Sequence, residues 1–142
     1  MRAFLMTTMV VGFGLTTVMM AEQALAVQDT PTTINGVETV CTGVGSAKDD
    51  PRWSAYPVKI VIANTAGENL AAMQIALTSN GKPVVQTTCD APWILFRLPA
   101  GHYGVTATMV TAPGTSRKAD FTTAGSGQKE VTIAFPAAAP NQ

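Results

Sequence analysis

Short runs of alternating apolar residues, separated by turn-forming residues, constrain the fold of this chain more than any other sequence feature. Val58, Ile60 and Ile62 recur at every second position, as do Val131, Ile133 and Phe135. A period of two places alternate side chains on opposite faces of a strand, whereas a helix repeats near 3.6 residues. Between residues 35 and 135 no segment shows a sustained helical period with capping residues. The chain is therefore predicted to be all-β.

The same alternation locates the expected strands and the turns between them. Asn80-Gly81 is the strongest turn signal, because both residues tolerate positive φ, and it predicts a β-hairpin. Other turns are expected at Asp90-Ala91-Pro92, Pro99-Ala100-Gly101 and Pro113-Gly114. Strands of this length and spacing predict a single antiparallel β-sandwich of about seven strands, prealbumin-like or immunoglobulin-like. The segments with strand character are 37–44, 58–62, 73–78, 84–89, 93–98, 102–111, 117–122 and 129–135.

The N-terminal residues have the pattern of a secretory signal peptide. Arg2 is followed by an uncharged, largely apolar run and then by Ala24-Leu25-Ala26, so cleavage is expected between Ala26 and Val27. A retained membrane anchor is the alternative, since the run approaches the length of a membrane span. The expected organisation is a signal peptide over 1–26, a flexible segment over 27–36, the sandwich over 37–135 and a flexible tail over 136–142. The protein is expected to be secreted or periplasmic, with no stable membrane span after cleavage.

The charge balance limits the classes of partner. The sequence contains nine Lys and Arg residues and nine Asp and Glu residues, so the formal net charge is zero. A neutral chain produces no long-range field that gathers nucleic acid or anionic lipid, so no nucleic-acid partner is expected. Weak self-repulsion permits a protein partner or self-association.

The sequence contains two cysteines, Cys41 and Cys89. In an oxidising compartment an even number of cysteines usually forms disulfides. A single intramolecular bridge is therefore expected, and the alternative is two separate thiols. Their spacing does not match a redox or metal-binding motif.

A family resemblance lies in the segment Leu98-Pro99-Ala100-Gly101-His102-Tyr103-Gly104-Val105-Thr106-Ala107. It resembles the L-P-x-G-x-Y-x-V-x-A signature of carboxypeptidase regulatory-like domains, which are small prealbumin-like β-sandwiches. The resemblance implies a domain found beside peptidases, in surface proteins or alone, with no shared catalytic residues. The segment from Cys41 to Pro57 departs from the common pattern and reads as an inserted loop, so whatever is particular to this protein is expected there.

Familiar catalytic and metal-binding motifs are not found in the sequence. His102 is the only histidine, and its strand position places it on the surface, so it supplies neither a zinc site nor a catalytic triad by itself. Asp49 and Asp50 are adjacent in the long loop and are candidate calcium ligands, but the D-x-D-x-D spacing is lacking, and a solvated turn is the alternative. No metal, no cofactor and no enzymatic activity are expected.

Three aromatic residues are the best candidates for a binding surface. Trp53 and Tyr56 lie in the inserted loop, and Trp93 begins a strand shortly after Cys89. A Cys41–Cys89 bridge would draw the base of the loop towards Trp93, so the rings would line one groove. Exposed aromatic faces suit sugar or peptide ligands. The alternative is burial, with Trp53 packing the loop onto the sandwich and Trp93 in the core.

These observations predict a secreted or periplasmic binding or interaction domain without catalytic activity. Its recognition surface would be the loop from Val44 to Tyr56, held by a rigid sandwich, and its partner a protein or a saccharide. One alternative is an assembly subunit in which an exposed edge strand pairs with a neighbouring chain. A second alternative is a carbohydrate-binding module built on the three aromatic residues.

Overall fold

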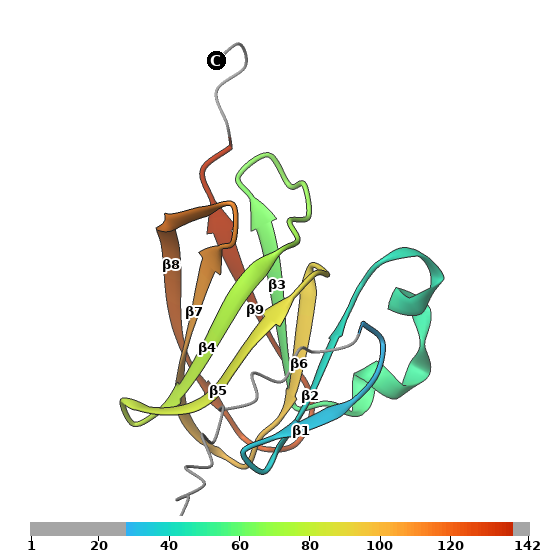
Figure 1. Cartoon of the computed structure of the whole chain (residues 1–142). Coiled ribbons are helices and arrows are strands. Elements are labelled where there is room, and N and C mark those ends of the chain that lie inside the picture. Colours follow the sequence, from blue (N-terminus) through green and yellow to red (C-terminus); the bar gives the residue numbers. More distant parts are fainter. Residues whose placement is uncertain (1–27, 138–142) are drawn as a thin grey trace, which may run out of the picture.

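The computed structural model describes residues 28–137, which form two packed β-sheets (Figure 1). The predicted signal peptide over 1–26 and the end of the predicted tail lie outside the described residues. One sheet has the strand order β1-β2-β6-β3-β9 and the other β5-β4-β7-β8. The strands are β1 (Thr32–Ile34), β2 (Val37–Thr42), β3 (Val58–Asn64), β4 (Met73–Ser79), β5 (Lys82–Cys89), β6 (Trp93–Arg97), β7 (Gly101–Met109), β8 (Ala112–Thr123) and β9 (Lys129–Phe135).

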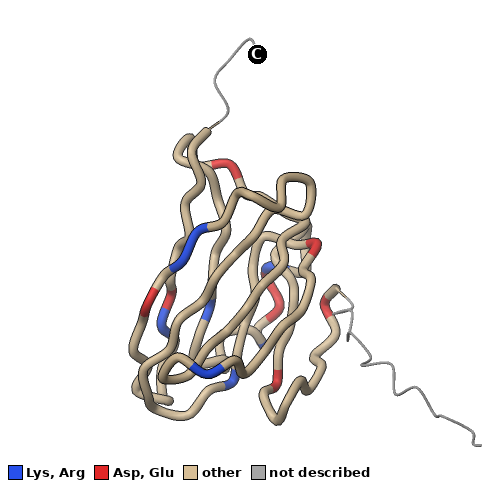
Figure 2. Tube along the Cα trace, turned by 60° about the vertical axis from the view of Figure 1, so that its left-hand side comes forward, with Lys and Arg blue, Asp and Glu red and all other residues tan. Residues whose placement is uncertain are grey.

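This architecture confirms the predicted all-β sandwich. Neighbouring strands are antiparallel except β3 and β9, which pair in parallel from Val58 beside Lys129 to Asn64 beside Phe135. After β8, which is the last strand of the four-stranded sheet, the chain crosses back to the five-stranded sheet. There β9 adds at the edge beside β3. Charged residues of both signs are interspersed along the tube in Figure 2.

The core lies between the two sheets and is built from the alternating residues that the sequence singles out. Val58, Ile60 and Ile62 of β3 are each 0 % exposed. They face residues of the opposite sheet such as Leu77 and Val105, which are also fully buried. Burial of these side chains supplies most of the stability of such a domain, because apolar surface gains about 25 cal/mol per Å² removed from water.

The predicted disulfide is present and crosses this core. Cys41 of β2 is bonded to Cys89 of β5, so the bridge connects the two sheets. The Cα atoms are 5.7 Å apart and both cysteines are 0 % exposed. Disulfides persist in oxidising compartments, so the bridge indicates such an environment. Among residues 28–137, no helix is long and apolar enough to cross a membrane.

The L-P-x-G-x-Y segment fixes the connection from β6 to β7. The hydroxyl of Tyr103 donates a hydrogen bond of 2.9 Å to the carbonyl oxygen of Pro99, four residues earlier. The Tyr103 ring stacks on Phe121 at 5.8 Å between centroids. A tyrosine whose hydroxyl donates a hydrogen bond to the backbone a few residues upstream recurs at the corners of β-sandwiches. The hydrogen bond to Pro99 explains why this position needs a tyrosine.

The structure differs from the sequence prediction at two turns. The segment 27–36, expected to be flexible, contains β1, because Asn35 and Gly36 have φ of 52° and 80° and form a tight hairpin into β2. The turn predicted at Pro113-Gly114 lies instead at Val110 and Thr111. Pro113 belongs to β8, an edge strand, where a residue without an N–H is tolerated.

Candidate functional site

The inserted segment, residues 44–56, folds against the outer face of the five-stranded sheet and is not an extended loop. It contains two short 3-10 helices, η1 (Gly45–Asp49) and η2 (Pro51–Ala55), which lie beside β2 in Figure 1. Asp50 joins them and caps η2, because its Oδ1 accepts a hydrogen bond of 2.9 Å from the backbone N–H of Arg52. Pro51 at the first position of η2 favours the same helical start.

Trp53 fastens this segment to the sheet. The side chain is 4 % exposed and belongs to a small apolar cluster with Val40, Tyr56 and Leu95, called the outer cluster below. The indole Nε1 donates to the carbonyl oxygen of Ala47 at 2.7 Å, which ties η2 to η1. Because Trp53 and the sheet bury each other, the conformation of the insertion is fixed by packing.

A third tie comes from the far end of the chain. The side-chain amide of Gln128, just before β9, donates a hydrogen bond of 2.8 Å to the carbonyl oxygen of Trp53. The backbone N–H of Lys129 also donates to the carbonyl oxygen of Pro57 at 2.7 Å. The insertion is therefore held both by the sheet beneath it and by the β8–β9 connection.

Tyr56 anchors the other end of the insertion. It is 2 % exposed, and its hydroxyl donates to Oε1 of Glu38 at 2.9 Å. Arg97 donates from Nε to Oε2 of Glu38 at 2.8 Å, and its guanidinium lies 4.7 Å from the centre of the Tyr56 ring. The hydrogen bonds from Arg97 and then Tyr56 hold the pKa of Glu38 below its usual value.

Trp93 lies on the same outer face, half-buried, at the start of β6. Gly43 packs directly on its indole: a Cβ at this position would lie 2.6 Å from Cγ of Trp93. Gly43 also has a φ of 106°, which only glycine adopts readily. The Nζ of Lys59, from the neighbouring strand β3, lies 3.5 Å from the centroid of the Trp93 ring.

A groove of about 290 Å³ lies between the insertion and the sheet. This volume is at the lower end of the range of small-molecule sites. It brings together four of the five candidate residues named from the sequence, all except Tyr56. The lining residues are Lys48, Asp49, Asp50, Pro51, Trp53, Ser54, Lys59, Trp93 and Gln128.

The three aromatic residues do not form the exposed platform that a stacked sugar requires. Trp53 and Tyr56 are buried in the outer cluster, and Trp93 is covered by Gly43 and Lys59. The prediction of one groove lined by all three rings is wrong for Tyr56. Its hydroxyl instead binds Glu38, which is paired with Arg97 across β2 and β6.

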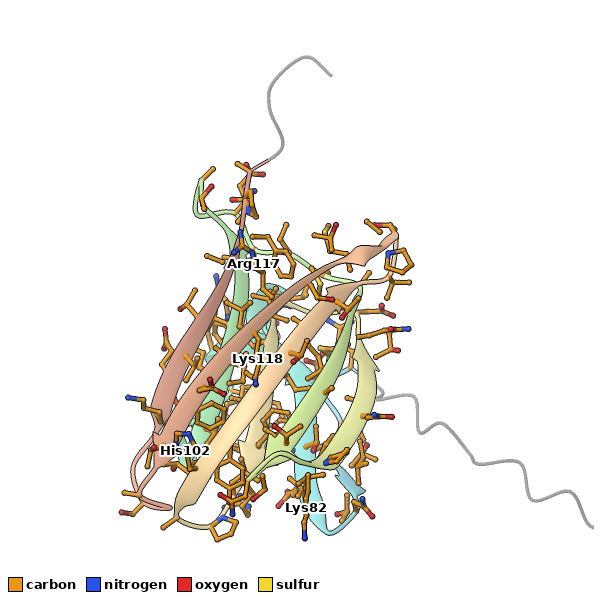
Figure 3. All side chains as sticks on the ribbon, turned by 90° about the vertical axis from the view of Figure 1, so that its left-hand side faces the viewer. Lys82, His102, Arg117 and Lys118 are labelled. Atoms are coloured by element: carbon orange, nitrogen blue, oxygen red, sulfur yellow. A yellow bond between two sulfur atoms is a disulfide. The ribbon has the colours of Figure 1, made fainter. Side chains whose placement is uncertain are left out.

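The other candidates have simple local roles. Asp50 forms an ion pair with Arg52 at 2.8 Å, and the hydrogen bonds from Arg52 lower the pKa of Asp50. No group of three His, Cys, Asp or Glu side chains within residues 28–137 is placed to hold a metal ion. His102 is exposed on β7, as predicted, and its Nδ1 lies 2.9 Å from the hydroxyl of Thr122 (Figure 3).

Lys59 and Gln128 are the residues of the groove that sequence reasoning missed. An outward lysine on an alternating strand reads as a solvated residue, and Gln128 lies in a Gly- and Ser-rich turn. Their contacts depend on pairing between strands that are distant in the sequence, so no local pattern identifies them.

Comparison with known proteins gives a likeness of fold. No family model matches the sequence, and no curated protein matches it significantly. Among solved structures, 5-hydroxyisourate hydrolase of Klebsiella pneumoniae is similar with a TM-score of 0.43 and 14 % identity, over 58 % of this chain and 90 % of that chain. No substrate or residue role is carried over to this protein at that distance.

The comparison nevertheless corrects one prediction. The lack of familiar catalytic motifs led to the expectation that the protein is not an enzyme, and this expectation is contradicted because the similar structure is that of a hydrolase. A fold hosts unrelated functions, so a β-sandwich does not by itself exclude catalysis.

The stability of the protein should fall as the pH rises from 10 to 12. Burial, followed by the hydrogen bond to Glu38, raises the pKa of Tyr56 from 10.0 to about 12. The unfolded chain then ionises this tyrosine first, so a contribution that is complete below pH 10 is lost as the pH rises through about 12. Since each pKa unit corresponds to about 1.4 kcal/mol, the loss is at most about 3 kcal/mol.

Urea unfolding at several pH values, with the wild type and Tyr56→Phe, measures this loss. Burial also raises the pKa of Tyr103. The loss of unfolding free energy that remains in Tyr56→Phe at high pH therefore includes the contribution of Tyr103. If the free energy of unfolding falls equally steeply with pH in the wild type and in Tyr56→Phe, the prediction is contradicted.

Proposed function

We propose that this protein, whose Leu98–Ala107 segment resembles carboxypeptidase regulatory-like domains, acts outside the cytoplasm as a ligand-binding domain. Its binding site is the groove between the 44–56 insertion and the outer face of the five-stranded sheet. The observation that carries the proposal is the way the insertion is fixed. The main core is complete between the two sheets without it, yet Trp53, Tyr56 and Gln128 hold it rigidly against the sheet.

Rigid attachment matters because a preformed concave site loses little conformational entropy when a ligand binds. Without the insertion, the outer face around Trp93 and Lys59 would be an open sheet surface. With it, Asp49 and Ser54 form one wall, and the β3 and β6 side chains form the floor. The groove is lined by three apolar residues and by six polar or charged ones, so it suits a small polar ligand.

The edge strands give less support to the alternative of an assembly subunit that pairs with a neighbouring chain. β8 is the long edge strand of the four-stranded sheet, with twelve residues. It carries Pro113, Arg117, Lys118 and Asp120, and prolines and charges on an edge oppose pairing with another chain. The carbohydrate alternative lacks an exposed aromatic platform, as described above.

A thermal-shift screen of small polar molecules tests the proposal when it is repeated with the groove blocked. A ligand that binds only the folded state should stabilise it by about 2.7 kcal/mol at a hundredfold excess over its Kd. The blocking variant is Ser54→Trp, since Ser54 is exposed on the groove wall and makes a single hydrogen bond, to Pro51. The shifts should disappear in Ser54→Trp.

The matched control is Ser116→Trp on the opposite sheet, where an exposed serine also makes a single hydrogen bond, to Thr108. Each ligand should raise the melting temperature of Ser116→Trp as much as it raises that of the wild type. Ligands that still bind Ser54→Trp, or a screen in which no compound stabilises the wild type, would count against the groove as the binding site.

A further inference from the structure

The floor of the groove carries a lysine whose charge is only partly compensated. The Lys59 side chain is 17 % exposed and is one of the residues that line the groove. Within residues 28–137, the partners of the ammonium are the Trp93 ring, at 3.5 Å, and the carboxylate of Glu130, at 3.6 Å. An ammonium has three N–H donors, and neither contact is a hydrogen bond of normal length to an oxygen.

The ion pair with Glu130 is a weak competitor for this ammonium. The Glu130 side chain is 58 % exposed on the edge strand β9, and its Oε2 lies 3.6 Å from the Lys59 ammonium. Exposed pairs of this kind contribute about 0 to 1 kcal/mol. The Trp93 ring holds the ammonium in place by a cation–π contact but supplies no acceptor oxygen. An incoming anion can therefore bind Lys59 at little cost.

The walls indicate which anion fits. Asp50 is paired with Arg52, and Asp49 stands exposed beside Lys48. No arginine lines the groove, although planar guanidinium groups are the preferred partners of phosphates. With Lys48 and Lys59 offset by the carboxylates of Asp49 and Asp50, the lining carries no net charge, so it matches a singly charged anion better than a phosphate.

We infer that the groove recognises a carboxylate on its small ligand, and that the carboxylate binds the ammonium of Lys59 while the rest of the ligand lies beside Trp93. This inference rests on the proposed function, since it assigns a ligand class to the same groove. It makes Lys59 the specificity-determining residue and Glu130 an internal competitor.

Two-dimensional NMR with benzoate, its neutral analogue benzamide and inorganic phosphate tests the inference. The chain has two tryptophans, so Trp93→Phe assigns the two indole N–H signals. Benzoate should shift the Trp93 signal and bind at least about tenfold more tightly than benzamide, because a hydrogen bond to a charged group is worth more than tenfold in affinity. Phosphate should bind more weakly than benzoate.

Two substitutions should change the benzoate affinity in opposite directions. Lys59→Met keeps a similar stem without the charge and should weaken binding at least about tenfold. Glu130→Gln removes the competitor and should strengthen binding by roughly two- to fivefold. Lys59→Arg keeps the charge and should retain binding, which separates loss of charge from damage to the groove.

Lys118→Met is the matched control. Lys118 is also an outward strand lysine paired with a carboxylate, Asp120 at 3.7 Å, and it lies on β8 of the four-stranded sheet, away from the groove (Figure 3). This variant should bind benzoate as the wild type does. If it weakens binding as much as Lys59→Met does, the effect is one of overall charge and the inference fails.

The remaining outcomes separate the two proposals. Equal binding of benzoate and benzamide, tighter binding of phosphate, or unchanged affinity in Lys59→Met would overturn the carboxylate inference and leave the groove as a binding site. If none of the three probes shifts the Trp93 signal and the screen with Ser54→Trp also finds no ligand, the proposed function fails with it.

Discussion

Loss of the Cys41–Cys89 disulfide is expected to lower the free energy of unfolding by about 4 kcal/mol. The two cysteines are 48 residues apart in the sequence, so the bridge strongly restricts the unfolded chain. In the folded state the bridge joins β2 to β5 across the core and is fully buried. A typical domain is stable by only about 5 to 15 kcal/mol, so the reduced protein should be marginal.

Urea unfolding of the oxidised and reduced protein measures this difference. Because the bridge is inaccessible in the folded state, reduction has to be carried out in denaturant before refolding. The double variant Cys41→Ala/Cys89→Ala is the control, since it should be at least as unstable as the reduced protein and should not respond to reductant. A difference below about 1 kcal/mol would show that the bridge is not a main support of the fold.

The sequence predicts the sandwich well because its evidence is local. Alternation assigns Ile60, Leu77 and Ile133 to inward faces, and all three are buried as expected. Asn80-Gly81 has positive φ at both residues and forms the predicted hairpin between β4 and β5. These features depend on a period of two and on turn chemistry, which are visible within a few residues.

The binding groove is less predictable because its geometry depends on contacts between distant segments. The insertion contains Trp53, but the partners that bury it, Val40 and Leu95, belong to strands on either side of it in the sequence. Both lie in segments with strand character, and nothing local in the sequence shows what covers their side chains. The insertion covers them, so the large aromatic residues of the loop serve as anchors, and Lys59 and Trp93 supply the part of the groove that belongs to the sheet.

Replacement of Trp53 by alanine should lower the free energy of unfolding by about 3 kcal/mol, the low end for a buried tryptophan. The side chain is 4 % exposed, and its removal leaves Val40 and Leu95 facing a cavity and also breaks the hydrogen bond to Ala47. The damage should be concentrated in the insertion, because the main core contains none of these contacts. Urea unfolding measures the global loss, and amide hydrogen exchange shows where protection disappears.

Trp93→Ala is the matched control for this variant. Trp93 is half-buried and outside both apolar clusters, so its loss should cost less, about 1 kcal/mol. In Trp53→Ala the amides of η1 and η2 should exchange rapidly while those of β4 and β7 stay protected, and ligands of the groove should no longer bind. Because the groove exists only while the insertion is attached, binding retained in a variant with rapid exchange across the insertion would place the ligand site elsewhere on the sandwich.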